Sequence, residues 1–209
     1  MSAKSDREKP ATALRKRVAA CTVCAASLPA GPRPIVQFSA SAAVLVIGQA
    51  PGAKVHASGV PWQDDSGDRL RAWMGIGADD FYDPSKIALV PMGFCYPGSR
   101  KGGDLPPRRE CAPLWHPPIF DILPPTRLTV LVGTYALAHY APQSPRQSLT
   151  DTVRSGGGLS PCIIPLPHPA WRVTLWMKKN PWFAETVLTR LQAAVRQSLG
   201  THVGASHSP

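Results

Sequence analysis

The hydrophobic positions of the chain gather in four short runs that do not alternate with polar residues. These runs cover residues 44–47, 87–90, 128–132 and 163–166. Uninterrupted apolar runs of this length are typical of strands that are buried on both faces of a parallel sheet. Because segments with helical spacing lie between them, the pattern predicts an α/β protein. We expect a three-layer α/β/α sandwich around a central, mostly parallel four-stranded sheet.

Two helices can be located by their apolar spacing. Leu70, Trp73 and Met74 follow an i, i+3, i+4 pattern, and Ser66 just before them is the predicted N-cap. Near the end of the chain, the Asn-Pro pair at 180–181 predicts an N-cap followed by proline at the first helical position. One apolar stripe follows this pair, made of Phe183, Val187, Leu188, Leu191, Val195 and Leu199.

The two ends of the chain lack such periodicity. We expect residues 1–9 and 200–209 to be flexible tails, and residues 10–199 to form one domain. Hydrophobic residues make up 44% of the chain and charged residues 17%. This balance is typical of a globular protein and excludes an intrinsically disordered one.

The chain is strongly basic, with 23 Lys and Arg against 13 Asp and Glu and a formal net charge of +10. Such an excess suits a polyanionic partner such as DNA, although many basic proteins bind no nucleic acid. No apolar stretch is long enough to span a bilayer, and the charged N-terminus is unlike a secretory signal. We therefore expect a cytoplasmic, nucleoid-associated monomer that does not bind membranes.

A glycine-proline turn, Gly48-Gln49-Ala50-Pro51-Gly52, directly follows the first predicted strand. Ligands of open α/β sheets usually bind at this end of the strands. The turn has neither the spacing of a dinucleotide-binding fingerprint nor the Lys-Ser/Thr of a P-loop. Alone it is more consistent with an ordinary strand-ending turn than with a ligand site. Three later segments accompany it: Gly59-Val60-Pro61-Trp62, Ser66-Gly67-Asp68-Arg69-Leu70 and, after the last predicted strand, Leu166-Pro167-His168-Pro169-Ala170-Trp171-Arg172.

Taken in order over residues 20–195, these segments resemble the uracil-DNA glycosylase superfamily, and within it the iron–sulfur branch. Members of that branch carry a G-[EQ]-[AG]-P-G turn, a G-x-P-[aromatic] segment followed by a small residue and glycine, and a His-Pro-[Ser/Ala] motif. The resemblance implies a monofunctional DNA glycosylase that starts base excision repair. Such an enzyme flips a deaminated base, uracil or a related one, out of single- or double-stranded DNA and hydrolyses its N-glycosidic bond.

The resemblance also assigns roles to residues. His168 would stabilise the negative charge of the leaving base, Trp62 would stack on the flipped base, and Gln49 would hold the sugar, the base edge or the attacking water. The remaining pocket positions are Gly48, Ala50, Pro51, Gly52 and Pro91. The expected DNA contacts are Lys54, Ser66, Pro169, Ala170, Trp171 as a wedge and Arg172 as a phosphate ligand, with further phosphate contacts from Arg69, Lys178 and Lys179.

The chain departs from the family pattern at two positions. Ala50 stands where the most efficient branch has an aspartate that orients water, which leaves Gln49, Asp64 and Asp65 as candidates for that task. Pro91 stands where the iron–sulfur branch reads uracil with an asparagine, and proline has neither an amide side chain nor a backbone N–H. The preferred base is therefore open, and other deaminated or oxidised bases are alternatives.

Four cysteines form two pairs, Cys21 with Cys24 and Cys95 with Cys111. Four thiolates suit zinc or an iron–sulfur cluster, and the wide second pair is less typical of zinc ribbons. Residues 96–100 and Glu110 look like the cluster loop of the iron–sulfur branch, which implies a structural [4Fe-4S] cluster; thiols without metal are the alternative. Cys162 is expected to be a small core residue.

Three other interpretations compete with the glycosylase. The first is a damage-sensing DNA-binding protein of the same fold with little or no turnover. The second is a tight uracil-DNA binder in which His168 attacks the abasic sugar; in the superfamily this variant has a basic, histidine-containing insertion, and Lys54-Val55-His56 is a short match to it. The third is an unrelated α/β hydrolase, for which the G-x-S-x-G elbow is missing.

Overall fold

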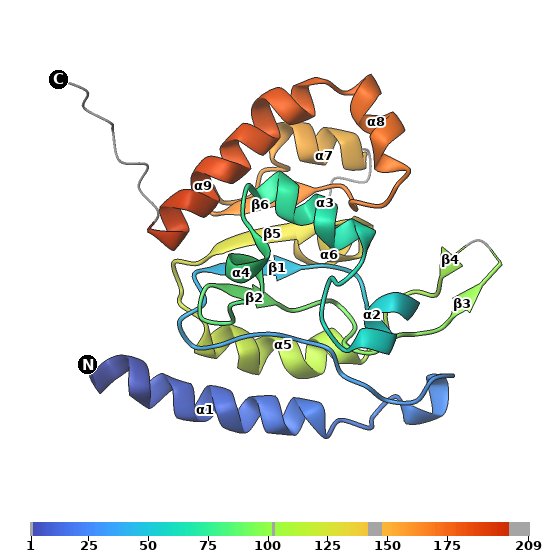
Figure 1. Ribbon diagram of the computed structural model, residues 1–209, viewed down its shortest axis with the longest axis vertical. Coiled ribbons are helices and arrows are strands. Elements are labelled where there is room, and N and C mark those ends of the chain that lie inside the picture. Colours follow the sequence, from blue (N-terminus) through green and yellow to red (C-terminus); the bar gives the residue numbers. More distant parts are fainter. Residues whose placement is uncertain (1, 102, 142–147, 201–209) are drawn as a thin grey trace.

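A parallel four-stranded sheet forms the centre of the protein (Figure 1). The computed structural model describes residues 2–101, 103–141 and 148–200, with side chains from Glu8 onward. The sheet has the order β2-β1-β5-β6. Its strands are β1 (Val44–Ile47), β2 (Ile87–Leu89), β5 (Leu128–Val132) and β6 (Ile163–Leu166). All four predicted strands are confirmed, and β2 ends one residue earlier than expected.

Helices cover both faces of this sheet and make the predicted three layers (Figure 1). In chain order they are α1 (Ser2–Ala19), the 3-10 turn Ala25–Ser27, α2 (Ala53–Ser58), α3 (Asp65–Met74), α4 (Ala78–Phe81), α5 (Cys111–Ile122), α6 (Thr134–Tyr140), α7 (Leu149–Ser155), α8 (Val173–Lys179), the π-helix Phe183–Leu188 and α9 (Thr189–Leu199). A small antiparallel hairpin, β3 (Ser99–Arg100) with β4 (Gly103–Asp104), projects beside α2.

The core consists of two apolar layers, because successive residues of each strand point to opposite faces. Leu45 and Ile47 of β1 pack with residues of α1, α5 and α6 on one face. Val44 and Val46 pack with α3, α9 and the π-helix on the other. The apolar stripe predicted near the C-terminus supplies this second layer, with Phe183, Val187, Leu191 and Val195 buried and Leu188 and Leu199 partly buried against it.

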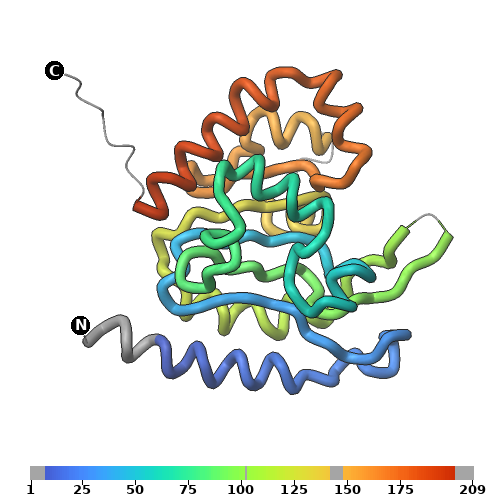
Figure 2. The backbone as a smooth tube through the Cα atoms, in the orientation of Figure 1, coloured from blue at the N-terminus to red at the C-terminus, as the bar shows by residue number. Residues whose placement is uncertain are grey.

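Residues 2–9 are helical, contrary to the expected tail over residues 1–9, and Met1 lies outside the described part of the chain. Helix α1 begins at Ser2 and lies along α5 (Figure 2). Glu8 anchors this helix: its carboxylate accepts hydrogen bonds from the Ser39 hydroxyl and the Ala40 N–H, and pairs with Arg15 at 2.8 Å. Of the expected C-terminal tail, Gly200 caps α9 in the left-handed conformation, and residues 201–209 lie outside the described part of the chain.

Three local expectations are wrong. Asp64, not Ser66, caps α3: its Oδ1 accepts the Gly67 N–H at 2.9 Å, and Ser66 lies in the first turn. Asn180 is the C-cap of α8, and its side chain accepts from the Trp182 indole N–H rather than from a backbone N–H. Cys162 is exposed and lies just before β6, so it is not a core residue.

Candidate active site

A cavity of about 450 Å³ opens at the carboxyl ends of the four strands. Each strand is followed by a segment that lines it, as expected for the ligand site of a parallel sheet. The predicted site residues that line it are Gln49, Ala50, Pro51, Gly52, Trp62, Ser66, Pro91, His168, Ala170 and Arg172. Motifs that are far apart in the sequence therefore meet in one site. Gly48 supports Trp62 from behind. The predicted DNA contacts outside the lining are Lys54, Arg69, Pro169, Trp171, Lys178 and Lys179.

Trp62 is held in this cavity by two glycines. A Cβ atom at Gly48 would lie 2.5 Å from Cζ2 of the indole, and one at Gly67 would lie 1.7 Å from the Trp62 carbonyl oxygen. Trp62 itself has a φ of 59°, and it is the one non-glycine residue with positive φ in the described ranges. Such a conformation costs about 1–3 kcal/mol and persists where the surroundings enforce it, commonly at ligand sites. The Tyr82 hydroxyl supports it by donating to the Trp62 carbonyl at 3.3 Å.

His168 lies beside Trp62, with ring centroids 6.0 Å apart and 27° between the planes. Burial lowers the pKa of His168, and the negative charge of Asp64 opposes this shift. The imidazole is therefore neutral at physiological pH and can donate one N–H hydrogen bond. Gly133, at the end of β5, allows this close packing: its φ is +83°, and a Cβ there would lie 3.3 Å from the His168 Cβ.

Two carboxylates line the cavity as well, and only one of them was a candidate from the sequence. Asp64 lies on the wall, whereas the neighbouring Asp65 points outward and pairs with the exposed Lys54 at 3.2 Å. The second carboxylate is Asp104 on β4, which no motif indicated. Of the three proposed water-orienting residues, the cavity thus contains Gln49 and Asp64.

Pro91 is fixed in the cavity wall by a histidine that sequence reasoning missed. The Pro91 carbonyl lies 2.9 Å from Nε2 of His116, which is 1% exposed. A carbonyl can only accept, so Nε2 carries the proton and Nδ1 accepts from the Tyr140 hydroxyl. Burial lowers the pKa of His116 to about 4, which keeps this arrangement neutral. The wall at Pro91 is therefore held by a buried hydrogen bond, and proline has no N–H to donate to a base.

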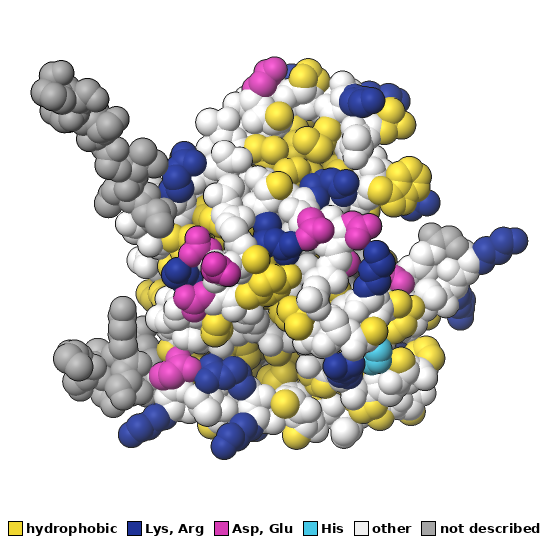
Figure 3. All heavy atoms as spheres, in the orientation of Figure 1, with side chains coloured by type: hydrophobic (Ala, Val, Ile, Leu, Met, Phe, Trp, Pro, Cys, Tyr) yellow, Lys and Arg dark blue, Asp and Glu magenta, His cyan; other side chains and the backbone are white. Residues whose placement is uncertain are grey.

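The loop after β6 presents an exposed aromatic residue next to the cavity. Trp171 is 71% exposed, and the guanidinium of Arg172 lies over its ring at 4.8 Å. Arg69, expected to bind phosphate, instead donates to the Pro169 carbonyl at 2.7 Å and holds this loop against α3. Basic side chains also project from the edge that holds α2, the β3–β4 hairpin and α8 (Figure 3). This edge belongs to the same side of the sheet as the cavity.

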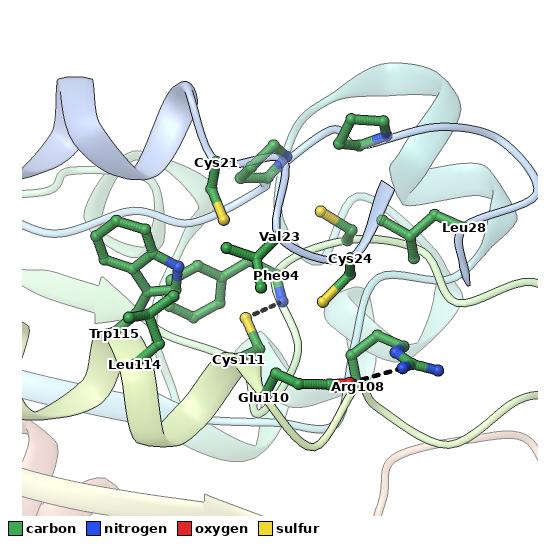
Figure 4. Close-up of a pocket in the computed structure, with 13 residues that line it drawn as sticks. Cys21, Val23, Cys24, Leu28, Phe94, Arg108, Glu110, Cys111, Leu114 and Trp115 are labelled. Carbon is green, nitrogen blue, oxygen red and sulfur yellow. Dashed lines mark hydrogen bonds and ion pairs between the residues drawn. The ribbon is translucent and has the colours of Figure 1, made fainter. Parts of the chain in front are cut away.

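The four paired cysteines line a second cavity, between the end of α1 and the start of α5. Figure 4 shows the sulfur atoms of Cys21, Cys24 and Cys111 turned into one space. The Phe94 N–H donates to the Cys111 sulfur at 3.3 Å, and burial raises the pKa of the Cys111 thiol to about 12. In the described part of the chain, no three His, Cys, Asp or Glu side chains are grouped so that they could share one metal ion.

An α/β sheet with a stacking aromatic residue, a neutral histidine and a glycine-proline turn at its carboxyl edge defines an enzyme-like ligand site. The profile of the uracil DNA glycosylase superfamily matches residues 35–192 of this chain, which is well over half of it. The chain therefore belongs to the uracil DNA glycosylase superfamily. Membership supports a glycosylase-type hydrolase that acts on DNA. Within the described ranges, no helix combines the length and apolar character needed to cross a membrane.

Proposed function

We propose that the protein is a monofunctional DNA glycosylase that flips a deaminated base into the 450 Å³ cavity and hydrolyses its N-glycosidic bond. The observation that carries this proposal is the juxtaposition of Trp62 and His168, 6.0 Å apart. Trp62 supplies a broad surface on which a flipped base stacks, worth about 1–3 kcal/mol. His168 supplies a hydrogen-bond donor beside that surface. Membership of the superfamily supports the same reaction class.

His168 acts on the leaving base in this proposal. As the bond between C1′ and the base nitrogen breaks, the base takes the electron pair and its carbonyl oxygen becomes more negative. The neutral imidazole donates a hydrogen bond to that oxygen, and burial limits the cost of reorganising solvent there. Water then supplies the oxygen at C1′. None of the described residues that line the cavity is a lysine, so no amine is placed to form a Schiff base, which favours the monofunctional reaction.

In this proposal, the side chain of Gln49 recognises the hydrogen-bonding edge of the base. It is the one side-chain amide among the described residues that line the cavity, and it can both donate and accept. Pro91 closes the other wall with an apolar ring and has no N–H to offer. A site with one adaptable amide favours deaminated bases as a class, namely uracil, hypoxanthine or xanthine. Ala50, Pro51 and Gly52, with Gly48 behind them, form the remaining wall of the pocket.

DNA would bind along the basic edge beside the cavity. Trp171 is the proposed wedge for the space that the flipped base leaves, and Arg172 the proposed phosphate ligand. Lys54 remains available for phosphate, because its pair with Asp65 is exposed and contributes little. The backbone of Pro169 and Ala170, together with Ser66 at the rim, completes the proposed contact.

We further propose that Cys21, Cys24, Cys95 and Cys111 hold a structural [4Fe-4S] cluster. All four line one cavity, which fits a four-thiolate site. Each thiolate of such a cluster binds a different iron, so the sulfurs need not be close enough to share one ion. N–H groups face the sulfurs, from Phe94 to Cys111 and from the Arg33 backbone to Cys95, and such bonds stabilise thiolate ligands. The cluster would tie α1 to α5 and to the cluster loop.

A second function is favoured by Ala50 and Pro91, which replace residues used for water orientation and base reading in the family. A damage-sensing DNA-binding protein would keep the pocket and the basic edge but would excise few bases.

One assay separates the two functions. Purified protein is incubated with end-labelled single- and double-stranded oligonucleotides that contain uracil, hypoxanthine, xanthine or no lesion, and is then treated with alkali. Lesion-dependent cleavage after alkali supports the glycosylase and identifies its base. Lesion-specific retention in a native gel without cleavage supports the sensor, and an adduct that survives denaturation indicates covalent attack by His168.

A further inference from the structure

The β3–β4 hairpin lies between Cys95 and Cys111 in the sequence, and it brings a carboxylate to the active-site cavity. Asp104 on β4 pairs with Ser99 on β3, so the hairpin itself sets its position. A Cβ atom at Gly52 would lie 3.2 Å from Oδ2 of Asp104, which places this oxygen against the turn that follows β1. Figure 1 shows the hairpin on the same side of the sheet as α2, at the carboxyl edge of the strands. Asp104 therefore lines the cavity that, in the proposed function, receives the flipped nucleotide.

Asp104 also interacts electrostatically with the other carboxylate of the cavity. Loss of hydration at the cavity wall raises the pKa of the Asp104 carboxyl, and the negative charge of Asp64 raises it further. The other titratable or charged groups that line this cavity, among the described residues, are Tyr135, His168 and Arg172. A carboxylate with a raised pKa is a stronger base than an ordinary surface aspartate.

The two carboxylates differ in how they are bound. The Asp64 carboxylate caps helix α3, because its Oδ1 accepts a hydrogen bond from the Gly67 N–H at 2.9 Å. The Asp104 carboxylate has no hydrogen bond or ion pair to any residue that the structure describes, and its side chain remains open to solvent. A carboxylate that has no protein partner and lies on the wall of a reaction cavity can bind and orient a water molecule.

We propose that Asp104 is the catalytic residue that activates the water. The most efficient branch of the family orients this water with an aspartate in the turn after the first strand, and this chain has Ala50 at that position. This inference rests on the proposed glycosylase function and adds a residue to its mechanism. The Asp104 carboxylate accepts one proton from the attacking water, whose oxygen forms the new bond to C1′. The bond from C1′ to the base nitrogen breaks, and the base leaves with its electron pair. That proton then returns to solvent or to the base anion. The Asp64 carboxylate, on the same cavity wall, supports the positive charge that develops on the sugar.

The test compares single-turnover excision by the wild type, Asp104→Asn and Asp121→Asn, over a range of pH, on the base that the wild type excises. Asp121 is the control, because it is exposed on α5 and does not line the cavity. We expect Asp104→Asn to slow excision by about 100-fold, a typical contribution of a general base. The wild-type rate should rise with pH through the pKa of Asp104 and then level off, and this rise should vanish in Asp104→Asn. Asp121→Asn should keep both the rate and the pH profile.

Binding and rescue measurements separate catalysis from structure. Asp104→Asn should bind lesion DNA at least as tightly as the wild type, since it removes a negative charge beside the phosphates. Formate should restore part of the activity of Asp104→Ala and none of that of His168→Ala. A fall in rate smaller than about tenfold, or a pH rise that persists in Asp104→Asn, overturns the proposal. A wild type that excises none of the tested bases contradicts the proposed function itself, and the inference fails with it.

Discussion

The carbonyl oxygen of Trp62 occupies the space in which a side chain at Gly67 would begin. A Cβ atom there would lie 1.7 Å from this oxygen, and the Trp62 backbone has a positive φ of 59°. Gly67 lies in the first turn of α3, whose cap, Asp64, binds the Gly67 N–H. The glycine of this motif, Gly67, therefore determines where the stacking aromatic residue of the cavity lies.

Replacement of Gly67 by alanine should displace Trp62. Alanine in a helix is ordinarily more favourable than glycine by about 1 kcal/mol, but here the clash with the backbone outweighs that gain. We expect Gly67→Ala to lower the free energy of unfolding by about 2 kcal/mol, as overpacking does, and to reduce base excision severely. Urea unfolding and a single-turnover assay measure the two effects. Gly77→Ala is the control, because a Cβ at Gly77 meets nothing within 4 Å. Equal stability and activity of the two variants would refute the account of Trp62.

The buried pair of His116 and Tyr140 should make stability depend on pH. The pKa of His116 is about 4 in the folded protein against an ordinary value of 6.5, so below pH 6.5 the unfolded chain takes up the proton first. Stability is then lost as the pH falls from 6.5 to 4. Between pH 7 and pH 5 we expect the His116 contribution to decrease by about 2 kcal/mol. Urea unfolding of the wild type and of His116→Gln at both pH values isolates it, because glutamine does not titrate.

The control for this pH effect is His56→Gln, which removes a histidine on α2 that lies against Tyr96 and does not contact His116 or Tyr140. It should keep the wild-type difference between pH 7 and pH 5. If His116→Gln shows the same pH dependence as the wild type, His116 is not held neutral in the fold.

The four paired cysteines should act as one unit. If they hold an iron–sulfur cluster, Cys111→Ser should abolish the visible absorption and the bound iron of anaerobically purified protein, and lower its thermal stability. Cys162→Ser is the matched control, since Cys162 is exposed and lies outside the four-cysteine cavity. Iron that is retained in Cys111→Ser, or absent from the wild type after reconstitution with iron and sulfide, would contradict the cluster.

The sheet and most of the cavity could be predicted from the sequence for a physical reason. The strands are buried on both faces and therefore appear as uninterrupted apolar runs, as at 128–132. The motifs at Gly48 and His168 both follow such runs, and parallel strands end at one edge, so the two had to meet.

What the sequence did not reveal depends on contacts between distant segments. Helix α1 has Pro10 within it and few apolar residues, and its first part is held by Glu8 reaching Ser39 and Ala40. Asp104 enters the cavity through a two-residue strand pairing that carries no apolar pattern. His116 contributes to the cavity wall because it hydrogen-bonds to the carbonyl of Pro91, which lies 25 positions earlier in the chain. Such contacts are set by tertiary packing, and no local spacing encodes them.

The most direct test of the proposed function is the single-turnover rate at which His168→Ala excises the base that the wild type removes from a labelled oligonucleotide. His139→Ala is measured in parallel as a control. We predict that His168→Ala loses about 100-fold or more in rate while it still binds the lesion DNA, and that His139→Ala stays close to the wild type. A His168→Ala variant that excises the base as fast as the wild type would contradict the proposed role of the Trp62–His168 pair.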